Sequence, residues 1–111
     1  MEEDFLSKLT RRMVNAFMDI IILSKLEITE RESEVTGYNL MKLINKKFNI
    51  LVGTGTVYAV LYSMERKGLI CSSLKGRRRI YKLTDQGEQV IQSLSASNLT
   101  SSNLIEALSL N

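Results

Sequence analysis

The chain has 111 residues and carries 15 Lys and Arg against 12 Asp and Glu, so its formal net charge at neutral pH is +3. A chain of this length predicts one domain, and 44% apolar residues are enough to build a hydrophobic core. The sequence holds no His and one Cys, which removes the commonest general base and metal ligand and excludes an internal disulfide.

These exclusions also bear on where the protein works. Internal disulfides mark oxidising compartments, so a chain that cannot form one is expected to be intracellular and cytoplasmic. The apolar run at residues 20–23 is far shorter than the roughly 20 residues that cross a bilayer, so we expect no membrane contact.

Residues 4–26 show the first helical pattern. Apolar side chains recur at steps of three and four, the period of one helix face: Phe5, Leu9, Met13, Ala16, Phe17, Ile20 and Leu23. Leu6, Val14 and Ile21 widen this stripe beyond what one core contact requires. The pattern leaves two interpretations open: a central helix of a small core, or a helix shared with a second subunit.

A second, shorter helix follows a charged loop over residues 27–35. Thr36 is placed to cap it, and the pattern predicts a helix over residues 36–48. Lys42 and Lys46 lie opposite its apolar residues, which are Gly37, Leu40, Met41, Ile44 and Phe48. This helix is therefore amphipathic and basic on its outer side.

A third helix is predicted over residues 54–67, with Thr54 as its cap and Gly68 suited to end it in a left-handed conformation. Its apolar side chains gather on one side: Val57, Val60, Leu61 and Met64. The outward residues are small or polar, with Tyr58 on the flank: Gly55, Ala59, Tyr62, Ser63 and Arg66.

From residue 69 the apolar period changes from that of a helix to that of a strand. The change predicts a β-hairpin over residues 69–83, joined through Lys75-Gly76-Arg77. Thr84 can cap a further helix, and we expect residues 84–110 to form a C-terminal helical segment. This segment ends on apolar residues with little core of their own to join: Leu104, Ile105 and Leu108.

The expected order describes a winged helix-turn-helix, a mainly α fold with a small β-hairpin, in one domain over residues 1–111. In such a fold the third helix enters the major groove of DNA, and the hairpin, or wing, brings cations to the backbone. The candidate DNA contacts are Lys42, Lys46, Thr54, Gly55, Thr56, Tyr58, Tyr62, Arg66, Arg77, Arg78 and Arg79. Three alternatives stay open: Tyr58 can be a core residue, the three arginines can be a solvated turn, and the lysines can serve solubility alone.

Three segments of the chain carry a family resemblance. Gly55-Thr56-Val57-Tyr58, then Leu61 and Glu65-Arg66-Lys67-Gly68-Leu69-Ile70, resembles the recognition helix and strand entry of the PadR-type family of transcriptional regulators. Thr36-Gly37-Tyr38-Asn39-Leu40 resembles the opening of its second helix, and residues 76–87 are similar to its wing and the start of its last helix. The resemblance covers about residues 16–94. Ala59 stands where the family usually has Pro, and Thr36 where it usually has His; neither change removes a type of DNA contact.

The resemblance implies a homodimeric DNA-binding regulator whose dimer is built from the first and last helices. We expect a repressor that binds specific double-stranded DNA sequences and needs no cofactor or metal. The residues expected at the dimer interface are Phe5, Leu9, Val14, Ile21, Leu104, Ile105 and Leu108. The short C-terminal segment and the lack of Trp do not favour a small-molecule effector.

The main alternative is a winged-helix module that binds another protein and does not read DNA. The adjacent arginines at residues 77–79 favour DNA over that alternative. An enzyme is the least favoured class, because Gly53-Thr54-Gly55 lacks the rest of a phosphate-binding fingerprint and no nucleophile motif is present.

Overall fold

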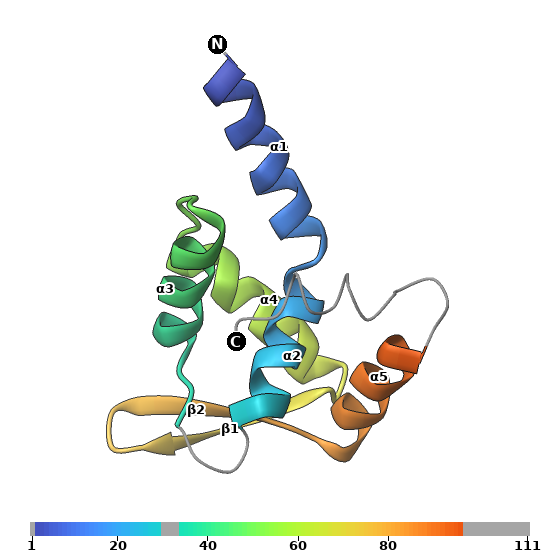
Figure 1. Ribbon diagram of the computed structural model, residues 1–111. Coiled ribbons are helices and arrows are strands. Elements are labelled where there is room, and N and C mark those ends of the chain that lie inside the picture. Colours follow the sequence, from blue (N-terminus) through green and yellow to red (C-terminus); the bar gives the residue numbers. More distant parts are fainter. Residues whose placement is uncertain (1, 30–33, 97–111) are drawn as a thin grey trace.

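The computed structural model describes residues 2–29 and 34–96 (Figure 1). Its elements in chain order are α1 (Glu2–Ala16), α2 (Met18–Thr29), α3 (Gly37–Phe48), α4 (Thr54–Arg66), β1 (Ile70–Lys75), β2 (Arg78–Leu83) and α5 (Asp85–Ala96). The described chain is thus mainly helical with one antiparallel two-stranded hairpin, which confirms the expected fold class.

The single helix predicted over residues 4–26 is divided at Phe17 into α1 and α2. Backbone hydrogen bonding continues across this point, because Phe17 N–H donates to Met13 O at 3.1 Å and Ile21 N–H donates to Phe17 O at 3.0 Å. Figure 1 shows α1 extending away from the other elements, while α2 runs through their centre. The wide apolar stripe therefore belongs to two helices with different surroundings.

The core is built around α2. Five apolar residues of α2 are almost fully buried, namely Met18, Ile21, Ile22, Leu23 and Leu26. The buried side chains of α3, α4, the hairpin and α5 join them in one cluster. Val14 and Ile21 are each 0% exposed within the single chain. This corrects the expectation that they meet a partner, because they have no surface left for one. By contrast, α1 leaves large apolar side chains exposed: Phe5, Leu6, Leu9 and Met13.

Side-chain hydrogen bonds fix the start of α3 and its connection to α4. The Thr36 side chain accepts from Asn39 N–H at 3.1 Å, and the Asn39 side chain accepts from Thr36 N–H, so Thr36 caps α3 as predicted. The Asn45 side chain accepts from Val52 N–H at 2.7 Å and holds the connector against α3. Thr54 was expected to cap α4 but is its first helical residue; Gly53 is the cap and offers no side-chain acceptor.

The hairpin pairs Ile70 with Leu83 at its base and Lys75 with Arg78 at its turn, where Gly76 has a φ of 66°. Val35, just before α3, adds a bridge to β2, because Tyr81 N–H donates to Val35 O at 2.9 Å. The start of α3 and the wing are therefore held together. In the described part of the chain, no helix is long and apolar enough to cross a membrane.

The start of α5 is fixed by Thr84 and Gly87. The Thr84 hydroxyl accepts from Gly87 N–H at 3.1 Å, which confirms Thr84 as the cap, and donates to Gly68 O at 2.6 Å. Gly68 has a φ of 79°, the left-handed conformation predicted for the end of α4. A Cβ at Gly87 would lie 2.0 Å from Leu69 O, so only glycine fits this close approach of α5 to the hairpin.

Candidate nucleic-acid interface

The outer face of α4 is made of small and polar residues. Val57, Leu61 and Met64 are buried against the core and fix the rotation of the helix. The residues on the other side are exposed: Thr54, Gly55, Thr56, Tyr58, Ala59, Tyr62, Ser63 and Arg66. A Cβ at Gly55 would meet nothing within 4 Å, so the surface of another molecule can approach the helix backbone closely at this position.

The two tyrosines of α4 have different neighbours. Tyr58 is 40% exposed, and its ring lies so close to Gly37 that a Cβ there would be 2.5 Å from Cζ. Tyr62 is 64% exposed, and the Arg66 guanidinium lies 5.6 Å from its ring centroid. Tyr58 thus packs in part against the start of α3, whereas Tyr62 and Arg66 form an exposed pair on the outer face.

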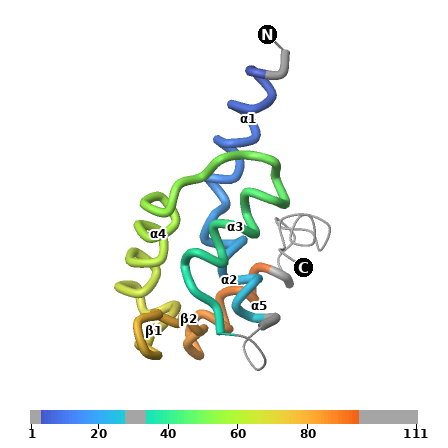
Figure 2. Tube along the Cα trace, turned by 90° about the vertical axis from the view of Figure 1, so that its left-hand side faces the viewer, coloured from blue at the N-terminus to red at the C-terminus, as the bar shows by residue number. Residues whose placement is uncertain are grey.

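The hairpin lies beside α4 on the same edge of the molecule (Figure 2). Its exposed cations are Lys75, Arg77, Arg78, Arg79 and Lys82. Because β1 packs against α4, the arginines expected to act with the third helix are brought to its side of the fold. We call the turn residues Lys75, Arg77, Arg78 and Arg79 the wing cations.

Most of the wing cations already have a protein partner. Lys75 Nζ lies 2.7 Å from one carboxylate oxygen of Glu34, and Arg78 Nη2 lies 3.0 Å from the other. The hydrogen bond from Lys75 lowers the pKa of the Glu34 carboxyl, Arg78 adds to this effect, and desolvation opposes it. Glu34 is therefore an anion near neutral pH and offsets one of the two positive charges of Lys75 and Arg78.

Arg79 and Arg77 differ from that pair. Arg79 Nη1 donates to Ser72 Oγ at 2.9 Å, and the same hydroxyl donates to Glu65 Oε2 at 2.7 Å, which links the wing to the last turn of α4. Within the described residues, Arg77 makes no hydrogen bond or ion pair. The wing therefore presents one unengaged cation and three engaged ones.

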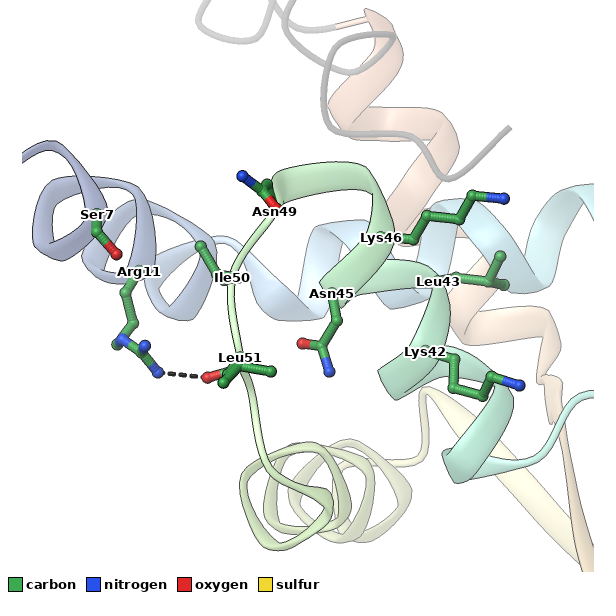
Figure 3. Close-up of a pocket in the computed structure, with 9 residues that line it drawn as sticks. All are labelled: Ser7, Arg11, Lys42, Leu43, Asn45, Lys46, Asn49, Ile50 and Leu51. Carbon is green, nitrogen blue, oxygen red and sulfur yellow. Dashed lines mark hydrogen bonds between the residues drawn. The ribbon is translucent and has the colours of Figure 1, made fainter. Parts of the chain in front are cut away.

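Lys42 and Lys46 are exposed residues of α3. They line an open groove of roughly 750 Å³ with residues of α1 and of the α3–α4 connector: Ser7, Arg11, Leu43, Asn45, Asn49, Ile50 and Leu51. Figure 3 shows Lys42, Leu43 and Lys46 on one side of α3 and Arg11 across the groove, where it donates to Leu51 O. None of the residues that line this groove belongs to α4 or to the hairpin.

The amino-acid sequence of residues 26–93 matches the family model described as the transcriptional regulator PadR-like family. The chain belongs to the PadR-like family of transcriptional regulators. A transcriptional regulator is the class of protein expected from the wing and the third helix. No curated protein sequence matches the chain.

Solved structures of PadR-like regulators share this fold. A regulator from Bacillus cereus has 28% identity and a TM-score of 0.64, with 86% of this chain and 97% of that chain covered. One from Eggerthella lenta has 26% identity and a TM-score of 0.65, covering 86% and 83%. Bacillus subtilis PadR, solved in complex with operator DNA, has 22% identity and a TM-score of 0.54, covering 68% and 44%, so this last similarity shows the fold alone.

Sequence reasoning missed four polar residues of this PadR-like interface: Glu34, Glu65, Ser72 and Lys75. Glu34 lies in a stretch that resembles any charged loop, and only the bridge from Val35 to Tyr81 brings it to the wing. Glu65 was noted as part of a motif, but nothing in the sequence shows that its partner is Ser72 on the next strand.

The residues expected at the PadR-like dimer interface are divided between several environments. Phe5 is 63% exposed and Leu9 is 40% exposed on the protruding α1. Val14 and Ile21 lie in the core, as described above. Leu104, Ile105 and Leu108 lie outside the described residues.

Proposed function

We propose that this PadR-like chain is a repressor that binds specific double-stranded DNA sequences as a homodimer. In this proposal α4 lies in the major groove and the β1–β2 wing lies on the adjacent backbone. The observation that carries the proposal is that α4, whose outer face is small and polar, lies beside the hairpin that carries the wing cations.

The chemistry of α4 supports reading of base edges. Thr54 and Thr56 at its exposed N-terminal turn offer hydroxyls, and Gly55 allows the backbone to come close. The unpaired N–H groups of that turn can bind a phosphate. Tyr62 and Arg66, about two turns further along, can contact base edges or the opposite strand. An isolated phosphate would contact only the N-terminal turn of α4. A duplex can contact that turn and also Tyr62 and Arg66.

The homodimer is supported by α1. One winged helix makes few base contacts, and a two-fold dimer reads two half-sites about 34–36 Å apart or a multiple of that distance. Large apolar side chains that are exposed on a protruding helix are typical of an interaction surface. In the proposal, Phe5 and Leu9 of α1 form the described half of a contact with a second copy, and residues 84–110 supply the remainder.

Binding of duplex DNA is tested by measuring its dependence on salt. Cations that neutralise phosphates release counterions, so the logarithm of affinity falls with the logarithm of salt concentration by roughly 0.9 per phosphate contact. Fluorescence anisotropy of the intact protein with random 30-base-pair duplexes should show a slope of several units. Binding that is absent at low salt would favour the module that binds only other proteins.

A further inference from the structure

We propose that Glu34 competes with the DNA backbone for Lys75 and Arg78, and so sets how strongly the wing binds a duplex. The inference rests on the proposed function, since it concerns what the wing contributes to DNA affinity. It assigns a role to an acidic residue that lies outside the recognition helix and outside the wing itself.

The geometry places one carboxylate between two wing cations. One oxygen of Glu34 lies 2.7 Å from Lys75 Nζ, and the other lies 3.0 Å from Arg78 Nη2. These two cations occupy paired positions at the turn end of β1 and β2. A single carboxylate therefore binds both strands of the wing at the end that is expected to meet the backbone.

The backbone around Glu34 keeps it there. Its neighbour Val35 is buried and accepts a hydrogen bond from Tyr81 N–H, and Thr36 begins α3 with a capping box. The residue is thus anchored on its C-terminal side by β2 and by α3. The Glu34 side chain keeps 38% of its surface exposed, so the pairs can open when another anion arrives.

A phosphate can engage Lys75 or Arg78 only by replacing Glu34 or by approaching it. The first requires breaking an ion pair, and the second places two anions close together, so both lower the affinity for DNA. Arg77 has no such partner within the described residues and meets a phosphate at no comparable cost. The four wing cations therefore contribute fewer than four phosphate contacts while Glu34 is ionised.

The test compares salt slopes of the full chain and its variants on one random duplex. Glu34→Gln should raise affinity roughly three- to tenfold near 0.1 M salt and steepen the slope by about one unit, because one more cation neutralises a phosphate. Asp19→Asn removes the same charge from an exposed position of α2. It should change the affinity and the salt slope much less than Glu34→Gln does. Equal affinity and slope for Glu34→Gln and the wild type would overturn the proposal.

A second arm identifies which cations Glu34 controls. Lys75→Gln should flatten the slope more in the Glu34→Gln protein than in the wild type, since only there is the ammonium free to bind DNA. Arg77→Ala should flatten it equally in both proteins, because Arg77 does not contact Glu34. Equal effects of Lys75→Gln in the two backgrounds would contradict the assigned role of Glu34.

A third arm needs no DNA and separates this inference from the proposed function. Carbon-detected NMR titration should show the Glu34 carboxyl ionising below its ordinary range in the wild type and closer to that range in Lys75→Gln. An ordinary pKa for Glu34 in the wild type would refute the pairing itself. A lowered pKa in a protein that binds no duplex would instead reject the DNA-binding function, and with it this role of the pairing.

Discussion

Tyr58 and Tyr62 lie close together on α4 but differ in how free they are to contact DNA. The ring of Tyr58 rests on Gly37, and this contact explains why the sequence has glycine at the first position of α3. Tyr62 contacts Arg66 and is exposed over most of its surface. A side chain that packs on its own chain has less freedom to meet a base, so we expect Tyr62 to contribute more to recognition.

This comparison gives the first prediction. Tyr62→Ala should weaken binding to a selected DNA site by about 1–3 kcal/mol, if the side chain reads a base edge. It should change the free energy of unfolding by no more than about 0.5 kcal/mol, because the side chain is exposed. Asn15→Ala, at an exposed position of α1, is the control and should leave the affinity unchanged. An unchanged affinity in Tyr62→Ala would show that this part of α4 does not face DNA.

Gly87 and Gly55 allow a second prediction, on stability. Gly87→Ala places a methyl group against the backbone oxygen of Leu69, which cannot rotate away, so we expect a loss of about 1–3 kcal/mol or more in urea denaturation. Gly55→Ala has open space around it and should stabilise the helix by up to roughly 1 kcal/mol while weakening DNA binding. A Gly87→Ala protein as stable as the wild type would contradict the close approach of α5 to the hairpin.

At the scale of elements, apolar periodicity predicts most of the helices and the hairpin because burial on one face leaves a regular trace in the sequence. The same trace could not separate α1 from α2, since apolar side chains continue through Phe17 and give no sign of the break. Nor could it distinguish the core residues Val14 and Ile21 from the exposed Phe5 and Leu9, because both environments select apolar side chains.

That distinction is the basis of a third prediction. Leu9→Glu places a charge on the exposed face of α1 and should shift the protein from dimer to monomer in sedimentation velocity, with its helical content kept. Ile21→Ala removes buried volume and should cost about 2–5 kcal/mol of folding free energy instead. A Leu9→Glu protein that stays dimeric would place the dimer contact elsewhere.

The cap of α5 gives a fourth prediction. Thr84→Ala removes the acceptor for Gly87 N–H and the donor to Gly68 O, so we expect a loss of about 0.5–2 kcal/mol in unfolding free energy. Thr84→Ser keeps the hydroxyl and should stay near the wild type. The prediction is wrong if the two variants are equally stable.

At the scale of the whole molecule, the proposed DNA contact depends less on the net charge than on where the cations lie. The hairpin that carries the wing cations lies beside α4, whereas Lys42 and Lys46 line a groove with Ser7 and Arg11 of α1. The sequence predicted the helix on which Lys42 and Lys46 lie, but not that they line a groove together with residues of α1. That groove depends on the contact between Arg11 of α1 and Leu51 of the α3–α4 connector, and the Glu34 pairs depend on the Val35 bridge; neither contact leaves a local pattern in the sequence.

The central claim is that this PadR-like chain reads a specific DNA sequence as a two-fold dimer. The most direct measurement selects bound duplexes from a random pool and compares affinities for the selected and the random duplex at one physiological salt concentration. We expect two inverted half-sites whose centres lie 10–10.5 base pairs apart or a multiple of that spacing, and a preference of at least about 10³. Enrichment of no sequence, with equal affinity for both duplexes, would contradict the account.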